Sequence, residues 1–331
     1  MNAGDRTERL LRWLPLILLP LLLVLGLCGG AYWIPPLELR SFFGTGTEPD
    51  PVLVLRLNRM AAAFVVGASL SLSGLVFQAV LRNPLAEPFI LGISGGASVG
   101  AALVIVCGLA AWSVLSIPFG ALAGALLALG VVLRISRGGS RGRENLLLSG
   151  VITGTIAGSL LMFLISIAHT DQLAGITWWM LGDLQTADPA LLGPGLIVLL
   201  AAFGVIWYHS RSVNALAIGD SEAWNLGVDT RKLTLLLVVA GSLLAACTVA
   251  LAGIIGFCGL IVPHMVRRVH GCDHRKTVPL AFLWGADFLM FCDLLSRMTY
   301  PFKDIPVGVI TSLIGGPLFL WIINRRAHHE N

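Results

Sequence analysis

The sequence contains 331 residues, of which 56% are hydrophobic and only 12% are charged. A soluble globular domain carries roughly 25% charged residues, so this composition excludes an ordinary water-soluble protein. The formal net charge of +4 does not indicate nucleic-acid binding, because the basic residues lie in short stretches between apolar runs. The six cysteines stand singly and form no CxxC pair, which excludes a disulfide framework or a zinc knuckle.

Long apolar runs predict membrane-spanning helices, since a helix that crosses the hydrocarbon core needs about 20 apolar residues. Ten such runs are present, at residues 14–32, 60–80, 89–107, 113–134, 146–168, 189–208, 233–252, 255–269, 277–297 and 306–324. The first run resembles a signal peptide, but its length and the lack of a following A-x-A site favour a retained span. We therefore expect one all-α membrane domain over residues 1–331, in which the short run 255–269 is the least certain span.

The distribution of Lys and Arg predicts the orientation of the spans, because cytoplasmic loops carry an excess of positive charge. If the N-terminus lies in the cytoplasm and ten spans alternate, 17 of the 22 Lys and Arg residues fall on the inner side. The five on the outer side are Arg40, Arg56, Arg59, Arg297 and Lys303. This asymmetry predicts that both termini are cytoplasmic.

Two segments between spans predict short helices. The outer segment 169–188 contains an apolar stretch at 172–182 that is flanked by acidic residues. The inner segment 209–232 contains residues 219–227, where Asp220 or Ser221 is a suitable N-cap and Gly227 a suitable residue after the C-cap. A short helix on the inner side, neither spanning nor strongly amphipathic, suggests a contact with another protein.

Several kinds of chemistry are excluded or weakly indicated. A P-loop needs glycine before its lysine, and none of the three lysines (Lys232, Lys276 and Lys303) follows glycine. The chain therefore cannot hydrolyse ATP through that motif, and we expect no catalytic residue and no cofactor in it. The cluster from His270 to His274 contains metal-ligand residue types, but it lies among basic residues and is interpreted as a solvated loop.

Two alternative functions rest on single residues. Asp287 lies deep in the ninth span, where an ionisable side chain could couple transport to an ion gradient. Ser94 lies in a GxSG sequence typical of intramembrane serine proteases, a mechanism that also needs a histidine at membrane depth. The histidines fall at or beyond span ends, which makes the hydrolase the weaker alternative.

Asp293 and Arg297 are four residues apart and are expected to pair on one helix face.

A series of motifs carries a resemblance to a known family. They are LRLNR at 55–59, QAVLRNPLAEP at 78–88, LGISGGA at 91–97, LLLSG at 146–150, WWMLG at 178–182, LAIGD at 216–220, AGIIGFCGLIVPH at 252–264, DHR at 273–275 and IPVG at 305–308. In this order, from about residue 14 to 324, the chain closely resembles the FecCD-type permeases. These are membrane subunits of ABC importers for iron–siderophore complexes, haem and vitamin B12.

The resemblance implies a fold of ten spans in two inverted halves, in the inner membrane of a bacterium. It also implies three protein partners: a second copy of the chain in a homodimer, a pair of cytoplasmic ABC ATPases that bind ATP and Mg²⁺, and a periplasmic or lipid-anchored substrate-binding protein. The remaining contacts are with membrane lipid. Ferric siderophore, haem and cobalamin permeases share these motifs, so the resemblance leaves the cargo open among the three.

The resemblance also implies roles for residues that match the family motifs. Outer arginines that pair with the binding protein correspond to Arg56, Arg59 and Arg297. The helix that docks on the ATPase corresponds to Gly219, Asp220, Glu222, Ala223 and Gly227. The cytoplasmic gate corresponds to Asn83 and Leu85 on one side and to Arg143, Glu144 and Asn145 on the other. Asn58 departs from the family pattern, which usually has proline at this position.

Overall fold

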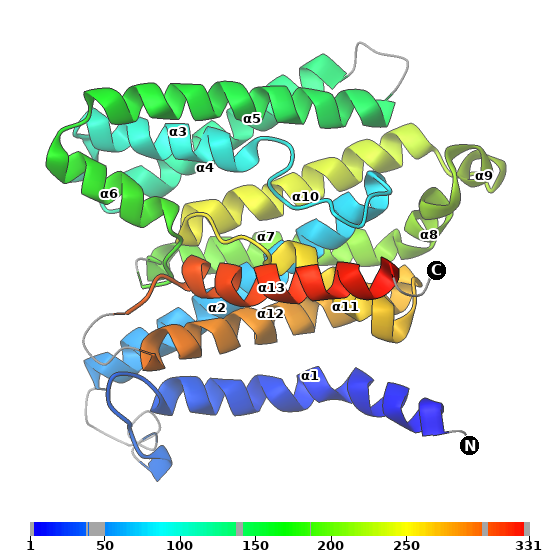
Figure 1. Ribbon diagram of the computed structural model, residues 1–331, viewed down its shortest axis with the longest axis horizontal. Helices are drawn as coiled ribbons and strands as arrows, with labels where there is room; N and C mark the ends of the chain where they lie inside the picture. The colour runs from blue at the N-terminus through cyan, green and yellow to red at the C-terminus, as the bar shows by residue number, and fades with distance from the viewer. Residues whose placement is uncertain are drawn as a thin grey trace.

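The computed structural model describes residues 3–37, 39, 50–136, 142–185, 187–299 and 304–327, and this part of the chain is all-helical (Figure 1). Its elements are α1 (Ala3–Cys28), α2 (Pro51–Val80), α3 (Ile93–Val106), the 3-10 turn η2 (Leu109–Ala111), α4 (Ser116–Ser136), α5 (Gly142–Ile167), α6 (Thr170–Met180), α7 (Pro189–Tyr208), α8 (Ser210–Ile218), α9 (Asp220–Asn225), α10 (Thr230–Ala252), α11 (Cys258–His270), α12 (His274–Met298) and α13 (Val307–Ala327). Each predicted span coincides with one helix, and α6, α8 and α9 lie between spans. Arg40 and Lys303, two of the five basic residues predicted on the outer side, lie outside the described residues.

Helix α1 begins at Ala3 rather than at residue 14, and α2 begins at Pro51 rather than at residue 60. The side chain of Asp50 accepts a hydrogen bond from the backbone N–H of Val52 (2.9 Å). Asp50 is therefore an N-cap, and the fixed φ of Pro51 suits the first helical position. As a result, Arg56 and Arg59 lie on the first turns of α2 instead of in a segment before it.

Two of the predicted spans are helices too short to cross a membrane. The 14 residues of α3 and the 13 of α11 extend about 21 and 20 Å, less than the roughly 30 Å of a hydrocarbon core. Each follows a long helix and a non-helical segment, 81–92 before α3 and 253–257 before α11. The arrangement of long helix, non-helical segment and short helix therefore occurs twice, and the inverted relation of the two halves stays a prediction.

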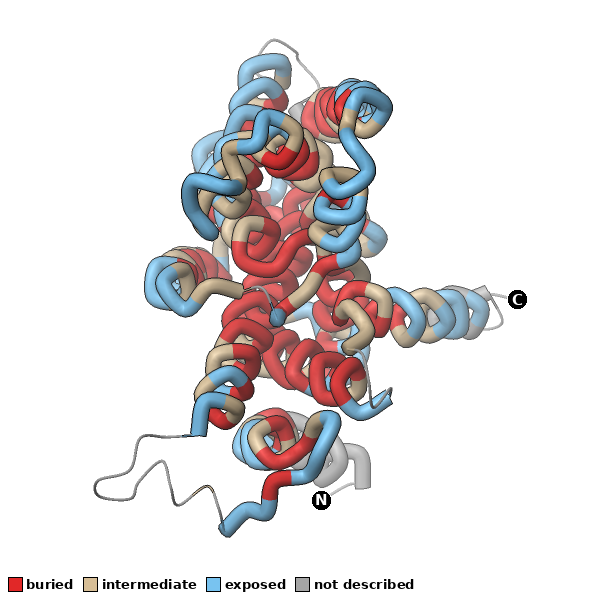
Figure 2. The backbone as a smooth tube through the Cα atoms, turned by 90° about the vertical axis from the view of Figure 1, so that its left-hand side faces the viewer, coloured by how far each residue is buried: buried red, intermediate tan, exposed pale blue. Residues whose placement is uncertain are grey.

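The centre of the bundle is α2. Of its most apolar 18-residue window, 89% is buried inside the protein, against 22% for α5 and α7. Figure 2 shows this buried centre, with exposed backbone on the flanks. Helices α10, α11 and α12 pack directly on α2, and α13 packs on α11 and α12 while standing out on one flank in Figure 2.

Glycines allow the closest helix approaches. Gly96 and Gly100 of α3 face Gly124 and Gly120 of α4, so that a methyl group added at any of the four would overlap the facing helix. Both pairs have the G-x-x-x-G spacing, which puts two small residues on one helix face. The same kind of contact joins α2 to α12 and α11. These small residues therefore form helix-packing faces.

The two ends of the bundle differ in content. Helix α1 begins and α13 ends at the same side, which also carries α8 and α9 (Figure 1). We call this the termini side. The end of α1, the beginning of α2 and the end of α12 lie at the opposite side, which we call the distal side. That the termini side is the cytoplasmic one stays a prediction.

The α3–α4 contact gives a prediction with a control in the same helix. Gly124→Ala places a methyl group against the backbone of α3, whereas Gly130→Ala in α4 meets open space. We expect Gly124→Ala to destabilise the protein by about 1–3 kcal/mol, a typical cost of overpacking. Gly130→Ala is expected to be neutral or stabilising by about 0.5–1 kcal/mol. Thermal unfolding of both variants in the same detergent checks this, and equal stabilities would contradict it.

Candidate functional site

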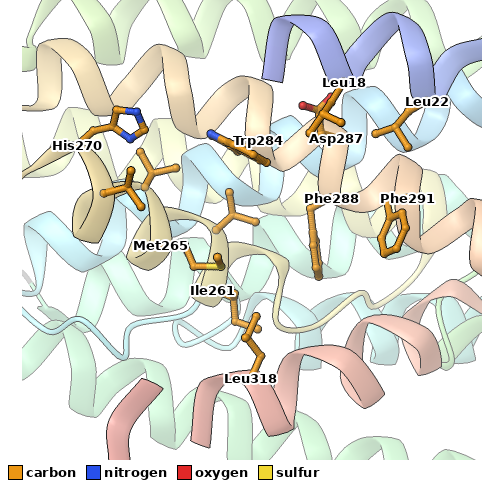
Figure 3. A pocket seen from close by; sticks show the side chains of 13 residues that line it. Leu18, Leu22, Ile261, Met265, His270, Trp284, Asp287, Phe288, Phe291 and Leu318 are labelled. Carbon is orange, nitrogen blue, oxygen red and sulfur yellow. The ribbon is translucent and has the colours of Figure 1, made fainter. Parts of the chain in front are cut away.

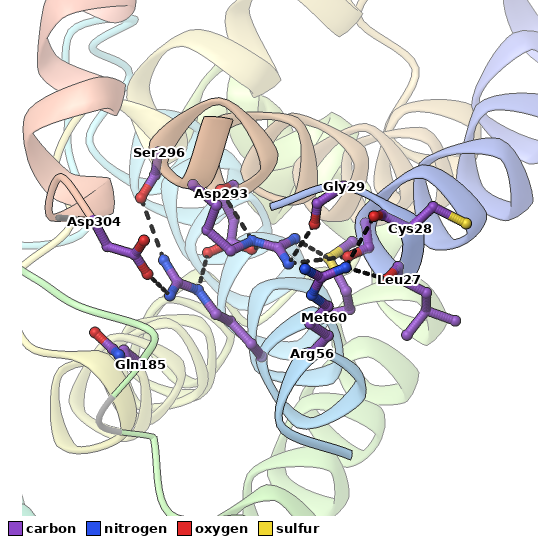
Figure 4. Close-up of polar contacts among 12 residues, drawn as sticks. Leu27, Cys28, Gly29, Arg56, Met60, Gln185, Asp293, Ser296 and Asp304 are labelled. Carbon is purple, nitrogen blue, oxygen red and sulfur yellow. Dashed lines mark hydrogen bonds and ion pairs between the residues drawn. The ribbon is translucent and has the colours of Figure 1, made fainter. Parts of the chain in front are cut away.

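Figure 4 shows Arg56 and Asp293 at the distal side, and the other two arginines predicted to dock a binding protein, Arg59 and Arg297, both pair with Asp293. Two of the three arginines belong to the first turns of α2 and the third to the last turn of α12. The exposed fractions of Arg56, Arg59 and Arg297 are only 6%, 4% and 4%. Other parts of the chain engage all three guanidinium groups. Docking through these residues stays a prediction.

Arg56 holds the distal end of α1. Its Nη1 donates to the carbonyl oxygens of Leu27 (2.8 Å) and Cys28 (2.9 Å). Its Nη2 donates to the carbonyl oxygen of Tyr32 (2.9 Å), and the guanidinium lies over the Tyr32 ring at 5.0 Å from the centroid. The last carbonyl groups of a helix have no partner within the helix, so Arg56 satisfies them and joins α1 to α2.

Asp293 is completely buried and lies between the other two arginines. Arg59 Nε lies 2.6 Å from Asp293 Oδ1, and Arg297 Nη2 lies 3.0 Å from Asp293 Oδ2. The second contact confirms the pairing expected from the spacing of four residues. Arg59 Nη1 also lies 2.5 Å from Asp304 Oδ2, just before α13. Charge-assisted hydrogen bonds thus connect α2, α12 and the beginning of α13.

A further acidic residue lies close to this cluster, in the segment between α6 and α7. Burial raises the pKa of Asp183 above its usual range, although the positive charge of Arg59 opposes the shift. The backbone N–H of Asp183 donates to the carbonyl oxygen of Ala252 (2.9 Å), at the end of α10. The segment after α6 is thereby fixed against the distal end of α10.

The predicted coupling helix is present on the termini side as α9, which directly follows α8. Gly219 is its N-cap residue, and Gly227 follows the C-cap with φ +80°, which confirms the predicted C-terminal end. The predicted N-cap is wrong, because Asp220 is the first helical residue and no side chain caps the helix. Glu222 lies in the first turn, and Ala223 is buried.

The carboxylate of Asp220 connects α9 to two other segments. Its Oδ1 lies 2.7 Å from Arg143 Nη2, in the first turn of α5. The same oxygen lies 3.5 Å from Arg82 Nη2, in the segment between α2 and α3. Arg82 also donates through Nε and Nη2 to the carbonyl oxygen of Leu216, at 3.0 and 2.8 Å. This use of the carboxylate explains why it does not cap α9.

The residues predicted to form the gate belong to the two segments that Asp220 joins. Asn83 Oδ1 accepts a hydrogen bond from the backbone N–H of Leu85 (2.9 Å), which makes a local turn, and the Leu85 side chain is exposed. Glu144 and Asn145 follow Arg143 in the first turn of α5. The structure therefore connects both predicted gate segments to α9, and their gating role stays a prediction.

Polar contacts that no sequence motif predicted hold the two non-helical segments together. Gln78 Nε2 donates to backbone carbonyls of the segment before α3 and of the first turn of α11, at 3.2–3.3 Å. Arg267 donates to Gln78 Oε1. Glu87 Oε1 accepts from the backbone N–H of Phe257 (3.2 Å), which precedes α11 and has a φ of +66°. Polar side chains beside apolar runs were the signal that could have indicated this contact.

The loop before α12 uses its polar residues to hold helices together. Asp273 caps α12, and Asn214 of α8 donates to it at 2.8 Å. The guanidinium of Arg275 and the amide of Asn214 hold the pKa of Asp273 well below its usual range. His274 Nδ1 lies 2.7 Å from Asn214 Oδ1. Two of the residues that suggested a metal cluster, Asp273 and His274, therefore join α8 to α12.

The residues behind the two alternative functions lie in different parts of the bundle. Ser94 is in the first turn of α3, and its carbonyl oxygen accepts a hydrogen bond from Ser98. His274 contacts Asn214, and the His264 ring packs against Phe319, so these imidazoles are used elsewhere. Asp287 is 2% exposed and lines a pocket between α1, α11, α12 and α13.

Comparison with known proteins gives a consistent result over the whole chain. The model of the FecCD transport family matches residues 18–325. The haemin transport system permease protein HmuU of Yersinia pestis is 36% identical, and the alignment covers 95% of this chain and 96% of HmuU. The vitamin B12 import system permease protein BtuC of Klebsiella pneumoniae is also 36% identical, with 97% of this chain and 95% of BtuC covered.

Solved structures agree with these relatives. A structure described as an inward-facing conformation of an ABC transporter of the metal-chelate type has a TM-score of 0.84 and 29% sequence identity. The alignment covers 96% of this chain and 99% of that one. PsaBC from Streptococcus pneumoniae, in complex with Fab, has a TM-score of 0.56 at 19% identity and supports the fold alone. With a family match over nearly its whole length, the chain belongs to the FecCD transport family.

Proposed function

We propose that this chain forms one half of the transmembrane pore of a binding-protein-dependent ABC importer, and that the cargo is a metal chelate. Ferric siderophore, haem and cobalamin are the candidates, because relatives over the full length are a haemin and a vitamin B12 permease. The observation that carries the proposal is the bridge at Asp220, since it connects a helix suited to a partner ATPase with both predicted gate segments.

The surface of α8 and α9 is suited to a protein partner. Ile218, Trp224 and Leu226 are all exposed there, at the termini side of the bundle. Exposed aromatic and aliphatic side chains that lie together mark interaction surfaces more often than isolated ones do. We assign this surface to the ATPase, which binds ATP and Mg²⁺ in place of this chain, and we assign the termini side to the cytoplasm.

The second half of the pore is a second copy of the chain. Helix α5 supports this arrangement, because it is among the least buried of the long helices. Its exposed face carries Thr155 and Ser159, whose hydroxyl groups bond to carbonyl groups of their own helix. Because most of this helix is left uncovered by the rest of the chain, we assign it to the contact with the second copy and to the pathway between the two copies.

In this proposal, transport is alternating access driven by the partner ATPases. The loaded binding protein docks at the distal side, and ATP binding draws the two α9 helices together. Because Asp220 bridges to Arg143 and Arg82, movement of α9 pulls on the beginning of α5 and on the segment that carries Asn83 and Leu85. The bundle then opens to one side or the other without breaking a bond in the cargo.

Removal of the Asp220 carboxylate tests the coupling. The Asp220–Arg143 pair is partly exposed, with side chains 55% and 19% exposed, so Asp220→Ala is expected to cost less than about 1 kcal/mol of stability. Uptake is expected to fall by roughly three- to tenfold while ATP hydrolysis persists, because the lost bridge corresponds to about 1 kcal/mol of coupling. Both rates are measured in proteoliposomes that contain the complete transporter.

A matched control is Lys232→Ala, which removes another ion pair on the termini side, Lys232–Asp229 (3.0 Å), with no connection to the predicted gate. We expect its uptake to equal that of the wild type. Reversing the pair with Asp220→Arg and Arg143→Asp is expected to restore part of the lost uptake. Wild-type uptake by Asp220→Ala would exclude the bridge as a coupling element.

The distal arginines need a test that separates docking from folding. Arg59→Gln leaves the fully buried Asp293 with fewer partners, and breaking a buried ion pair costs about 3–5 kcal/mol. We expect Arg59→Gln to lower the unfolding temperature strongly. Asp304→Asn removes the partner of Arg59 that is 30% exposed and is expected to lower it little. If the arginines act by docking alone, Arg59→Gln will unfold like the wild type and lose only affinity for the binding protein.

The cargo and the rival functions can be tested in one strain. Deletion of the chromosomal copy is expected to abolish uptake of one of three labelled solutes: ferric siderophore, haem or cobalamin. Complementation with Asp287→Asn or Ser94→Ala is expected to restore uptake fully, because neither residue has a role in the proposed mechanism. Loss of uptake with Asp287→Asn alone would favour an ion-coupled carrier, and loss with Ser94→Ala alone would favour a hydrolase.

A further inference from the structure

A pocket of about 480 Å³ lies between α1, α11, α12 and α13 (Figure 3). Its walls come from four helices and are almost entirely apolar, with Leu22 of α1, Ile261 of α11, Phe288 of α12 and Leu318 of α13 among them. Small-molecule sites typically have volumes of about 300–1,000 Å³ and mainly apolar walls. The pocket therefore has the size and the lining of a site for one small molecule.

Asp287 places a carboxyl group in this apolar wall. The residue is 2% exposed, and neither of its carboxyl oxygens has a hydrogen-bond partner among the described residues. It lies about 20 Å along α12 from the helix start, close to the middle of the span. A buried polar group without a partner is costly in an apolar medium. A ligand that donates a hydrogen bond to this carboxyl group removes that cost, and the gain stabilises the complex.

The rim of the pocket indicates the route by which a ligand arrives. Met265 and Val269 of α11 and Phe291 of α12 line the pocket and are also exposed. Phe291 belongs to a helix long and apolar enough to span a membrane, and Met265 and Val269 lie beside it on α11, so we take the rim to face lipid hydrocarbon rather than water. Charged solutes cross into hydrocarbon at high cost, whereas an uncharged amphiphile concentrates there. A plain acyl chain can fill the volume but cannot donate a hydrogen bond to Asp287.

We propose that this Asp287 pocket binds an uncharged, membrane-borne amphiphile with an apolar body and one hydroxyl group. The body lies along the α11 face from Ile261 to Val269, a length of about 12 Å, and the hydroxyl group donates to the carboxyl group of Asp287. Binding at this position bridges α1, α11, α12 and α13. The inference stands apart from the identity of the transported cargo.

Photolabelling of the complete transporter in lipid nanodiscs tests the proposal. Three probes share a twelve-carbon chain with a diazirine near its middle: an alcohol, an amine and a plain alkane. We expect the alcohol to label peptides of α11 and α12 around Met265 and Phe291. Labelling by the alcohol is expected to exceed that by the alkane about tenfold, since one hydrogen bond to a buried carboxyl group corresponds to about this factor.

Variants separate hydrogen bonding from volume. Asp287→Leu is expected to lower labelling by the alcohol about tenfold and to leave the alkane unchanged. Asp287→Asn, which keeps a hydrogen-bonding side chain, is expected to retain labelling within about twofold. Met265→Trp fills the rim and is expected to abolish labelling by all probes. The matched control is Leu127→Trp, an exposed position on α4 outside the pocket.

Three results would overturn the proposal. Equal labelling by the alcohol and the alkane would mean that the pocket is an ordinary lipid groove. Preference for the amine in the wild type, lost in Asp287→Asn, would mean that Asp287 binds a cation instead. A photoreactive residue at position 291 that cross-links to a second copy of the chain would mean that the partner permease covers the pocket. Circular dichroism and thermal unfolding confirm that each variant is folded before labelling.

Discussion

The burial of α2 is the constraint on which the rest of the structure depends. A helix surrounded by other helices in a membrane protein must present small or apolar side chains on every face, and its polar residues must find partners within the protein. The glycines and serines in the middle of α2 meet the first condition, while its ends carry the polar residues. Arg56 and Arg59 lie at the distal end, and Gln78 lies at the other. One helix therefore extends from the region that we assign to the binding protein to the region that we assign to the ATPase.

Polar side chains inside the bundle bond to the backbone of the non-helical segments or form ion pairs between helices. Glu87 accepts from the backbone N–H that precedes α11, and Gln78 donates to carbonyl groups of the segment before α3 and of the first turn of α11. At the distal side, Asp293 forms ion pairs with two arginines, which neutralise its charge. Each of these contacts replaces water that the membrane cannot supply. Asp287 is different, because the described residues leave both of its carboxyl oxygens without a hydrogen bond.

The two sides of the bundle are built with different strength. Buried ion pairs at the distal side join α2 to α12, and Arg59 also pairs with Asp304 just before α13, which suits a rigid platform. At the termini side, Asp220 is more than half exposed and shares one oxygen between two arginines. Exposed ion pairs are worth about 0–1 kcal/mol, so this bridge can lengthen or exchange partners at little cost. A firm distal side and an adjustable termini side are what alternating access around a fixed bundle requires.

The sequence by itself determined the class, the ten helical segments and the family. Apolar content and run length decide whether a chain enters a membrane, and these are local properties of the sequence. The start of α9, the early start of α2 and the short α3 and α11 depended on caps and on partners distant in the chain. Only the tertiary structure decided that Arg56, Arg59 and Arg297 are buried, because Asp293, Asp304 and the end of α1 come together by folding. The charge tally located these arginines, but it contained no information on which oxygens would surround them.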